Sequence, residues 1–227
     1  MSWWSGCCGF AGLPKTPVWN LLLRPMQPSP VRRFLPVALV SLLALMPLWY
    51  YLAAQFAAPV FFIAGEAFTA VFRWAQGYES KGSIGVLNTS LKVLSVQGSQ
   101  VRSGTLAPAV DYRLWGYGMV IFWALLVASR PRGWGLKLLT GTAVMLPVQA
   151  ISVGLQWSHD VFNRAGADVF VQTRLPGWWA DVVAFLYHFN LFIFAALAPV
   201  VVWLWLDRSF VAQWRAIAAA AASRKPR

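Results

Sequence analysis

Charged residues are scarce in this sequence, and acidic residues are the scarcest. Only 11% of the 227 residues are charged, with seven acidic residues against 19 basic ones. Soluble domains carry about 25% charged residues, so this chain lacks the groups that usually cover a surface in contact with water. The composition therefore excludes an ordinary soluble globular protein.

Residue types that serve catalysis or metal binding are equally few. The only cysteines are the adjacent pair Cys7 and Cys8, and the only histidines are His159 and His188. Adjacent cysteines rarely join to each other, because a disulfide requires suitably directed Cβ atoms. No HExxH, GxSxG or phosphate-binding loop motif occurs. We therefore expect no catalytic residues and no cofactor.

Long apolar runs are what the sequence has instead. About 20 apolar residues in a helix cross the ~30 Å hydrocarbon core of a bilayer. Three runs reach that length, and a fourth is adequate if Arg113 lies at the membrane interface. The four predicted spans are residues 34–58, 113–129, 136–157 and 182–206. The predicted fold is mainly α: an integral membrane protein with a four-helix transmembrane bundle.

The distribution of charge predicts the orientation of these spans. Twelve of the 19 basic residues lie before the first span, between the second and third, or after the fourth, with Asp207 as their only acidic neighbour. Because Lys and Arg resist translocation, residues 1–33 and 207–227 are expected in the cytoplasm, the first as a disordered tail and the second as a basic tail. We expect a bacterial inner (cytoplasmic) membrane protein in contact with the lipid bilayer. Topology accounts for the net charge of +12, so no nucleic acid partner is expected.

Residues 59–112, between the first two spans, are predicted to form a small α+β periplasmic lobe. Glu66, Thr69, Arg73 and Gln76 fall on one stripe at helical spacing, which indicates an amphipathic helix over 60–76 on the outer leaflet. Gly77 would end that helix. Short strands are then expected at 84–87, 91–96 and 100–102. Such a lobe is too small to be stable alone, so we expect it to pack on the spans or on a partner.

A second periplasmic segment, residues 158–181, raises the alternative of a metal site. Four side chains near the outer ends of the third and fourth spans could converge, namely His159, Asp160, Asp181 and His188. Convergent His and carboxylate ligands would make the chain an envelope metal-handling protein or a membrane enzyme. The simpler interpretation is that His188 forms an interhelical hydrogen bond with a group such as Gln149 or Asn190.

Several short motifs in the second half of the chain resemble one membrane protein family. They are Tyr117-Gly118 followed by residues 124–129, residues 146–150 with Pro147 and Gln149, and Tyr187 followed by residues 197–203 with Pro199. These motifs, in matching order over roughly residues 112–210, are similar to those of exosortase H-associated membrane proteins. Met119 and Val120 depart from that pattern, which has a proline soon after the Tyr-Gly pair.

The resemblance implies an accessory to an exosortase, a membrane cysteine transpeptidase that processes proteins with C-terminal sorting tails. Because neither cysteine lies in a span, the chain is expected to be a non-catalytic, partner-binding inner-membrane protein. The residues expected to serve partner binding or packing are Tyr117, Gly118, Pro147, Gln149, Tyr187 and Pro199. Small residues such as Gly118 let helices approach closely, either within the chain or against a helix of the partner.

Overall fold

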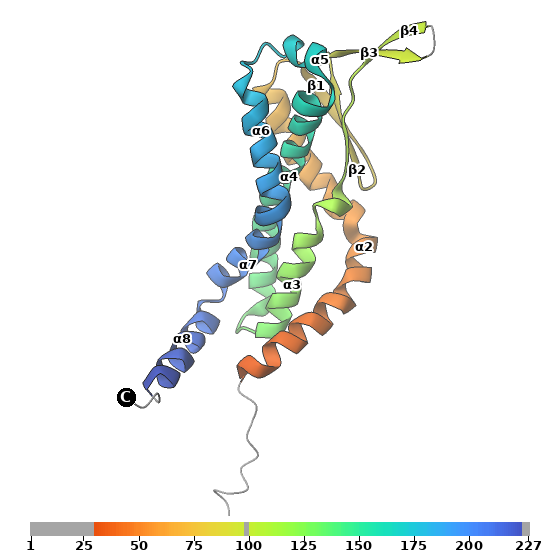
Figure 1. Ribbon diagram of the computed structural model, residues 1–227. Helices are drawn as coiled ribbons and strands as arrows, with labels where there is room; N and C mark the ends of the chain where they lie inside the picture. Colours follow the sequence, from red (N-terminus) through yellow and green to blue (C-terminus); the bar gives the residue numbers. More distant parts are fainter. Residues whose placement is uncertain (1–29, 98–99, 224–227) are drawn as a thin grey trace, which may run out of the picture.

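The computed structural model describes residues 30–97 and 100–223 and is mainly helical, with a small β region at one end of an elongated body (Figure 1). The helices of the body are α2 (Pro30–Val71), α3 (Tyr117–Ser129), α4 (Trp134–His159), α6 (Trp178–Phe189) and α7 (Ala195–Leu206). A π-helical turn, η3 (Asn190–Phe194), joins the last two into one path. Helix α3 packs against α2, α4 and α7.

Among the described residues, three helical segments are long and apolar enough to cross a membrane. They are Arg33–Val71, Trp134–Arg164 and Trp178–Leu206. Helix α3 is apolar but has only 13 residues, which is about 20 Å of helix. Three of the predicted spans therefore correspond to helices of sufficient length, and the second corresponds to a shorter one.

Helix α2 differs from the prediction in one important respect. It runs for 42 residues through Pro36, Pro47 and Pro59, so the predicted span 34–58 and most of the predicted surface helix 60–76 form one helix. That helix ends at Val71, and residues 75–76 already belong to β1. The boundary expected at Pro59 is wrong, because a proline can kink a helix without ending it where neighbouring groups compensate.

The aromatic face of the second half of α2 explains why the helix continues. Phe61 and Phe68 are buried, and their rings lie 6.2 and 5.7 Å from the ring of Trp157 in α4. Burying these aromatic side chains against α4 removes their area from water or lipid headgroups. This aromatic face packs on another helix, and the expected position of the segment on the outer leaflet stays a prediction.

The β region comprises two antiparallel units. One is a sheet of order β1-β2-β5, from β1 (Ala75–Lys81), β2 (Ile84–Thr89) and β5 (Ala109–Asp111); the other pairs β3 (Lys92–Gln97) with β4 (Gln100–Thr105). The predicted strands overlap β2, β3 and β4, whereas β1 and β5 were not predicted. Gly77 lies inside β1, and the turn to β2 is made by Gly82, whose φ of +64° suits glycine.

Close contacts attach this region to the helices. The backbone of β2 approaches α2 so closely that a Cβ atom at Gly85 would collide with the ring of Phe61. On the other side, the Gln172 side chain of α5 (Ala167–Gln172) accepts a hydrogen bond from the Lys92 amide and donates one to its carbonyl, both at 2.9 Å. The β region is therefore anchored to the helical body at two places.

The two segments that flank the last long helical path contain more helix than expected. Residues 158–181 continue α4 into a π-helical turn, η2 (Asp160–Arg164), followed by α5, rather than forming a loop. Residues 208–223 of the predicted basic tail form α8 (Arg208–Ser223). Most of the predicted N-terminal tail, residues 1–29, lies outside the described residues, and Pro30 to Arg33 already belong to α2.

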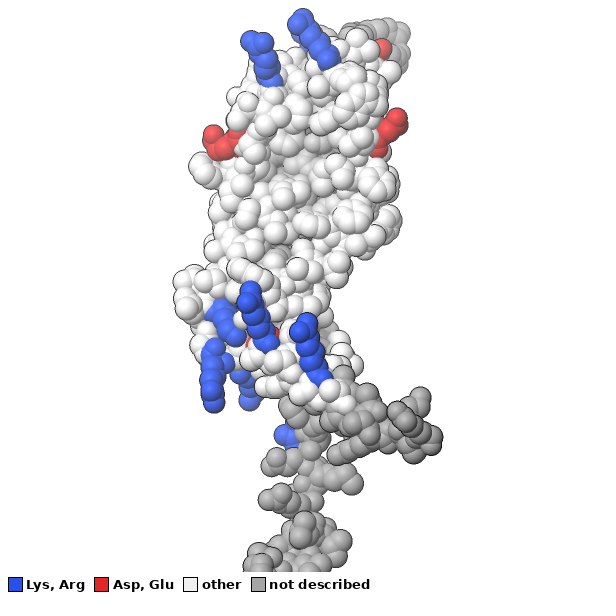
Figure 2. Space-filling view, turned by 90° about the vertical axis from the view of Figure 1, so that its left-hand side faces the viewer, with Lys and Arg blue, Asp and Glu red and all other residues white. Residues whose placement is uncertain are grey.

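Charged side chains gather toward the two ends of the body, and Figure 2 shows a broad uncharged band between them on the face in view. Large apolar side chains are exposed along the helices, among them Leu39, Leu43, Phe185 and Phe192, the last 72% exposed. Exposed apolar area on this scale marks a surface that contacts lipid or another protein.

Candidate functional site

Gln149 of α4 lies at the centre of a buried polar junction. It is 2% exposed, accepts a 2.6 Å hydrogen bond from the Tyr112 hydroxyl and donates a 3.2 Å bond to the Gly116 carbonyl. Tyr112 belongs to the 3₁₀ turn η1 (Tyr112–Leu114) that precedes α3. Burial raises the pKa of the Tyr112 phenol, which keeps it protonated as a donor. The junction connects the start of α3 to the middle of α4.

Gly118 lies close to this junction, on the face of α3 that contacts α4 and α7. A Cβ atom there would lie 3.3 Å from the Ala195 carbonyl oxygen, 3.3 Å from Met145 Cε and 3.6 Å from Pro199 Cγ. Gly118 and Pro199 are both buried. The surface around Gly118 is thus occupied by helices of the same chain, so a partner helix cannot reach it.

Tyr187 of α6 joins the junction through its ring. It stacks on His159 with centroids 4.1 Å apart and meets the edge of Trp115 at 6.0 Å. Tyr117 is half-buried beside the buried Gly118. The residues that carry the family resemblance on α3, α4 and α6–α7 therefore meet mainly inside the helical body.

A second interhelical hydrogen bond lies between α4 and the π-helical turn η3. The Ser152 hydroxyl donates to Asn190 Oδ1 at 2.9 Å, and both residues are buried. His188 instead bonds through Nδ1 to the Ala184 carbonyl of its own helix at 2.6 Å. The expected bond from His188 to Gln149 or Asn190 is therefore wrong: the exposed imidazole bonds within its own helix, and the two amides bond to other residues.

The four candidate metal ligands do not assemble. The rings of His159 and His188 are 6.1 Å apart, while Asp160 is paired with Arg164 at 3.1 Å and also accepts from Gln156. Asp181 is exposed. Within residues 30–97 and 100–223, no group of three or more His, Cys, Asp or Glu side chains could hold a metal ion.

Pro147 is the exception among the resemblance residues, since it lies at the surface. It lines an apolar groove of about 360 Å³ between α2 and α4. Several of the residues that line this groove are small, namely Ala64, Ala67, Ala150 and Gly154. The groove runs along helices that are apolar enough to be in a membrane.

The chain matches the model of a known family, described as exosortase H-associated membrane protein, over residues 28–210. It belongs to that family. The match extends beyond the motifs of the second half to include α2 and the whole β region, and it ends within α8. Comparison with curated proteins and with solved structures found no match.

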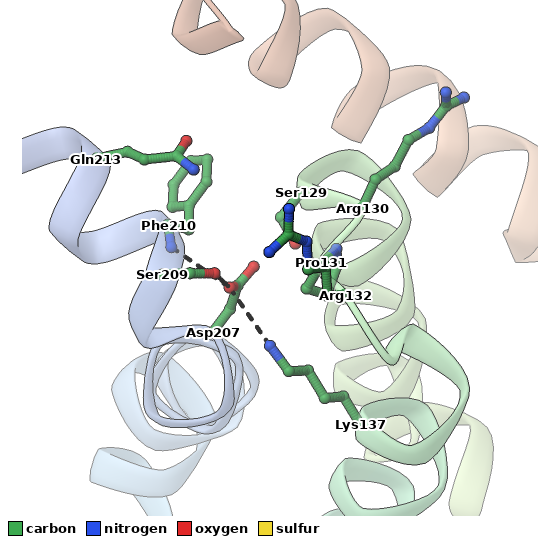
Figure 3. A pocket seen from close by; sticks show the side chains of 9 residues that line it. All are labelled: Ser129, Arg130, Pro131, Arg132, Lys137, Asp207, Ser209, Phe210 and Gln213. Carbon is green, nitrogen blue, oxygen red and sulfur yellow. Dashed lines mark hydrogen bonds and ion pairs between the residues drawn. The ribbon is translucent and has the colours of Figure 1, made fainter.

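One buried charge was missed by reasoning from the sequence. Asp207, between α7 and α8, is 1% exposed and lies 3.6 Å from Lys137 at the start of α4. Its position as the single acid among twelve basic residues was the available signal. Figure 3 shows this pair within a polar cavity at the end of the body where α8 lies.

Proposed function

We propose that this exosortase H-associated protein is a non-catalytic membrane subunit that binds an exosortase directly. The family name supports association with the exosortase H system. The proposal rests on the positions of the residues that carry the family resemblance. Gln149 and Gly118 lie where helices pack together, and Pro147 lines an apolar groove. These are roles in packing and binding rather than in chemistry. No observation favours the metal-handling alternative.

The membrane arrangement that we propose has four spans. Helix α3 would be the second, with Arg113 and Arg130 at its two ends reaching the interfaces, as long basic side chains do. At 1.5 Å per residue α2 is about 63 Å long, roughly twice the ~30 Å hydrocarbon core. Its second half would therefore project into the periplasm and carry the β region as a periplasmic lobe, with both termini in the cytoplasm of a bacterial inner membrane.

The groove between α2 and α4 is the place proposed for docking. Its lining on α2, residues 63–68, lies in the half that would project into the periplasm, so the proposed occupant is the periplasmic end of a transmembrane helix of the exosortase. Small residues along a groove let a second backbone approach closely, and such packing drives helix association in lipid. Pro147, which cannot donate a backbone hydrogen bond, adds an irregular edge. The face around Gly118 is not available for this purpose, because α7 already covers it.

Filling the groove tests the proposal. Ala67 is exposed and lines the groove, so Ala67→Phe should obstruct a partner helix without disturbing the interior. We expect about tenfold less exosortase to co-purify with the tagged full chain, a loss of roughly 1.4 kcal/mol in binding. The measurement is quantitative mass spectrometry of the complex extracted from membranes.

Ala58→Phe is the matched control. Ala58 is also exposed on α2 and lies nine residues away, on the opposite side of a helix with 3.6 residues per turn. It should leave the recovery of exosortase unchanged. Equal recovery with Ala67→Phe and the wild type would contradict docking in the groove, and absence of exosortase from the wild-type preparation would contradict direct binding altogether.

A further inference from the structure

A polar cavity of about 590 Å³ opens between the α3–α4 turn and the α7–α8 junction. Arg130, Arg132 and Lys137 line it on one side, and Asp207, Ser209 and Gln213 on the other. Figure 3 shows the side chains of Arg132 and Lys137 reaching toward Asp207, while Arg130 is directed away from it. Three cations and one carboxylate leave an excess of positive charge on the cavity wall.

Only one oxygen of the single carboxylate is engaged within the structure, because Asp207 Oδ2 is buried without a hydrogen-bond partner in the described part of the chain. Asp207 Oδ1 accepts a 2.7 Å bond from the Ser209 hydroxyl and a 3.4 Å bond from the Phe210 amide, which caps the start of α8. The same oxygen lies 3.6 Å from Lys137 Nζ. Neither Arg130 nor Arg132 forms an ion pair within the part of the chain that the structure describes. The two guanidinium groups therefore remain available to an anion.

The turn that carries the arginines has a defined backbone. Arg130 ends α3 with a φ of +43°, its amide bonded to the Leu126 carbonyl. Pro131 is buried, and Gly133 precedes α4 with a φ of +71°. A left-handed residue at the end of a helix followed by proline is a regular way to stop it. The arginines are thus presented by a short, well-defined connection.

An apolar groove adjoins the cavity and shares one residue with it. Leu126, Val127, Arg130 and Trp134 line this groove of about 300 Å³. Val127 is 39% exposed and Trp134 is 59% exposed. Arg130 therefore lies at the boundary between the basic cavity and an apolar groove beside the last turn of α3, a helix with no charged residue.

We propose that these two hollows together bind one anionic glycerophospholipid. The phosphate would lie against the guanidinium groups, which form strong charge-assisted hydrogen bonds with phosphate oxygens. An acyl chain would follow Val127 and Trp134. Basic pockets between transmembrane helices are a known form of site for anionic lipid headgroups. A free phosphate ester shares the headgroup chemistry, but it would leave the apolar groove empty.

Native mass spectrometry of the full chain in mild detergent, with equal amounts of phosphatidylglycerol and phosphatidylcholine, tests this site. We expect one phosphatidylglycerol bound with about tenfold preference over phosphatidylcholine, and Arg130→Gln with Arg132→Gln to abolish that preference. Both arginines are exposed, so the double variant should fold. Glycerol 3-phosphate in excess should not displace the lipid.

Arg208→Gln with Arg215→Gln is the control, because it removes the same charge from α8 without altering the cavity lining. It should keep the preference for phosphatidylglycerol. If this control lost the preference for phosphatidylglycerol equally, the proposal would be overturned, because anionic lipid would then be attracted to the basic end of the protein in general. Persistence of the preference in the cavity variant would overturn the site, and displacement by glycerol 3-phosphate would overturn the lipid as its ligand.

Discussion

Buried amide side chains are the residues that decide which helices are neighbours. Gln149 and Asn190 are 2% and 1% exposed, and an amide left without partners in an apolar interior is costly. Each bonds to a residue far away in sequence: Gln149 to Tyr112, 37 positions earlier, and Asn190 to Ser152, 38 positions earlier. Apolar helices can slide against each other with little change in buried area. These hydrogen bonds, in contrast, can form only when the two helices are in one register.

A double-mutant cycle of Tyr112→Phe and Gln149→Leu tests the first of these bonds. Interhelical hydrogen bonds in membrane proteins contribute about 0.6 kcal/mol on average and up to roughly 1.7 kcal/mol. We expect each single variant to lower the midpoint of thermal unfolding in detergent. The double variant should lose less stability than the two single losses added together.

The second bond of the junction, from Gln149 to the Gly116 carbonyl, provides a check within the same cycle. Gln149→Leu also removes the donor to the Gly116 carbonyl, so it should be the more destabilising single change. Strictly additive losses would show that Tyr112 and Gln149 are not coupled in the folded protein.

The length of α2 and the close packing of α3 determine how the helices are arranged. Helix α2 joins the membrane segment to the β region without interruption, so the position of that region follows from the direction of one helix. Helix α3 is short and lies against α2, α4 and α7. Its fit depends on Gly118, where the neighbouring α7 backbone leaves little room for a side chain.

Enlarging Gly118 should therefore destabilise the protein itself. A Cβ atom at 3.3 Å from the Ala195 carbonyl is tight, so Gly118→Ala should cost about 1–3 kcal/mol, the range for overpacking. Gly118→Leu should prevent a monodisperse preparation. Unfolding of each variant can be followed by loss of the size-exclusion peak on heating in detergent.

Gly135 supplies the control for this series. It lies in the first turn of α4, and a Cβ atom there would have nothing within 4 Å. Gly135→Leu should keep the wild-type peak and midpoint. If Gly118→Leu were as stable as Gly135→Leu, α3 and α7 would not pack as closely as described.

The distribution of charge over the whole molecule predicts its orientation in the membrane. Basic residues concentrate toward the end that holds α8 and the α3–α4 turn, and an uncharged band separates this end from the other on the face shown in Figure 2. Three described helical segments are long and apolar enough to cross a bilayer. With Lys and Arg retained in the cytoplasm, the β region should face the periplasm.

Alkaline phosphatase fusions test this orientation, because the reporter forms its disulfides only in the oxidising periplasm. A fusion after Arg227 should be inactive, and an insertion near Gly98 should be active. An insertion at Gly133, in the α3–α4 turn, is the internal control and should also be inactive. The reverse pattern, or activity at both Gly98 and Gly133, would contradict the four-span arrangement.

The fold class, a mainly helical membrane protein, and the positions of its long helices could be predicted from the sequence, because a hydrocarbon core requires about 20 apolar residues in each full span. The runs starting at residues 34, 136 and 182 met that requirement, and helices long enough to span a membrane contain them. The short motifs of the second half likewise identified the family that the match over residues 28–210 shows. These features are local, so composition and order along the chain were sufficient.

Only the tertiary structure decided how those helices meet. The continuation of α2 past Pro59 depends on Trp157 of α4 covering Phe61 and Phe68. The cavity at the basic end combines residues 129–137 with residues 207–213. Such contacts join positions that are distant in sequence. Apolar runs have many neighbours of similar packing energy, and the choice among them comes from side-chain shape and from the few buried hydrogen bonds.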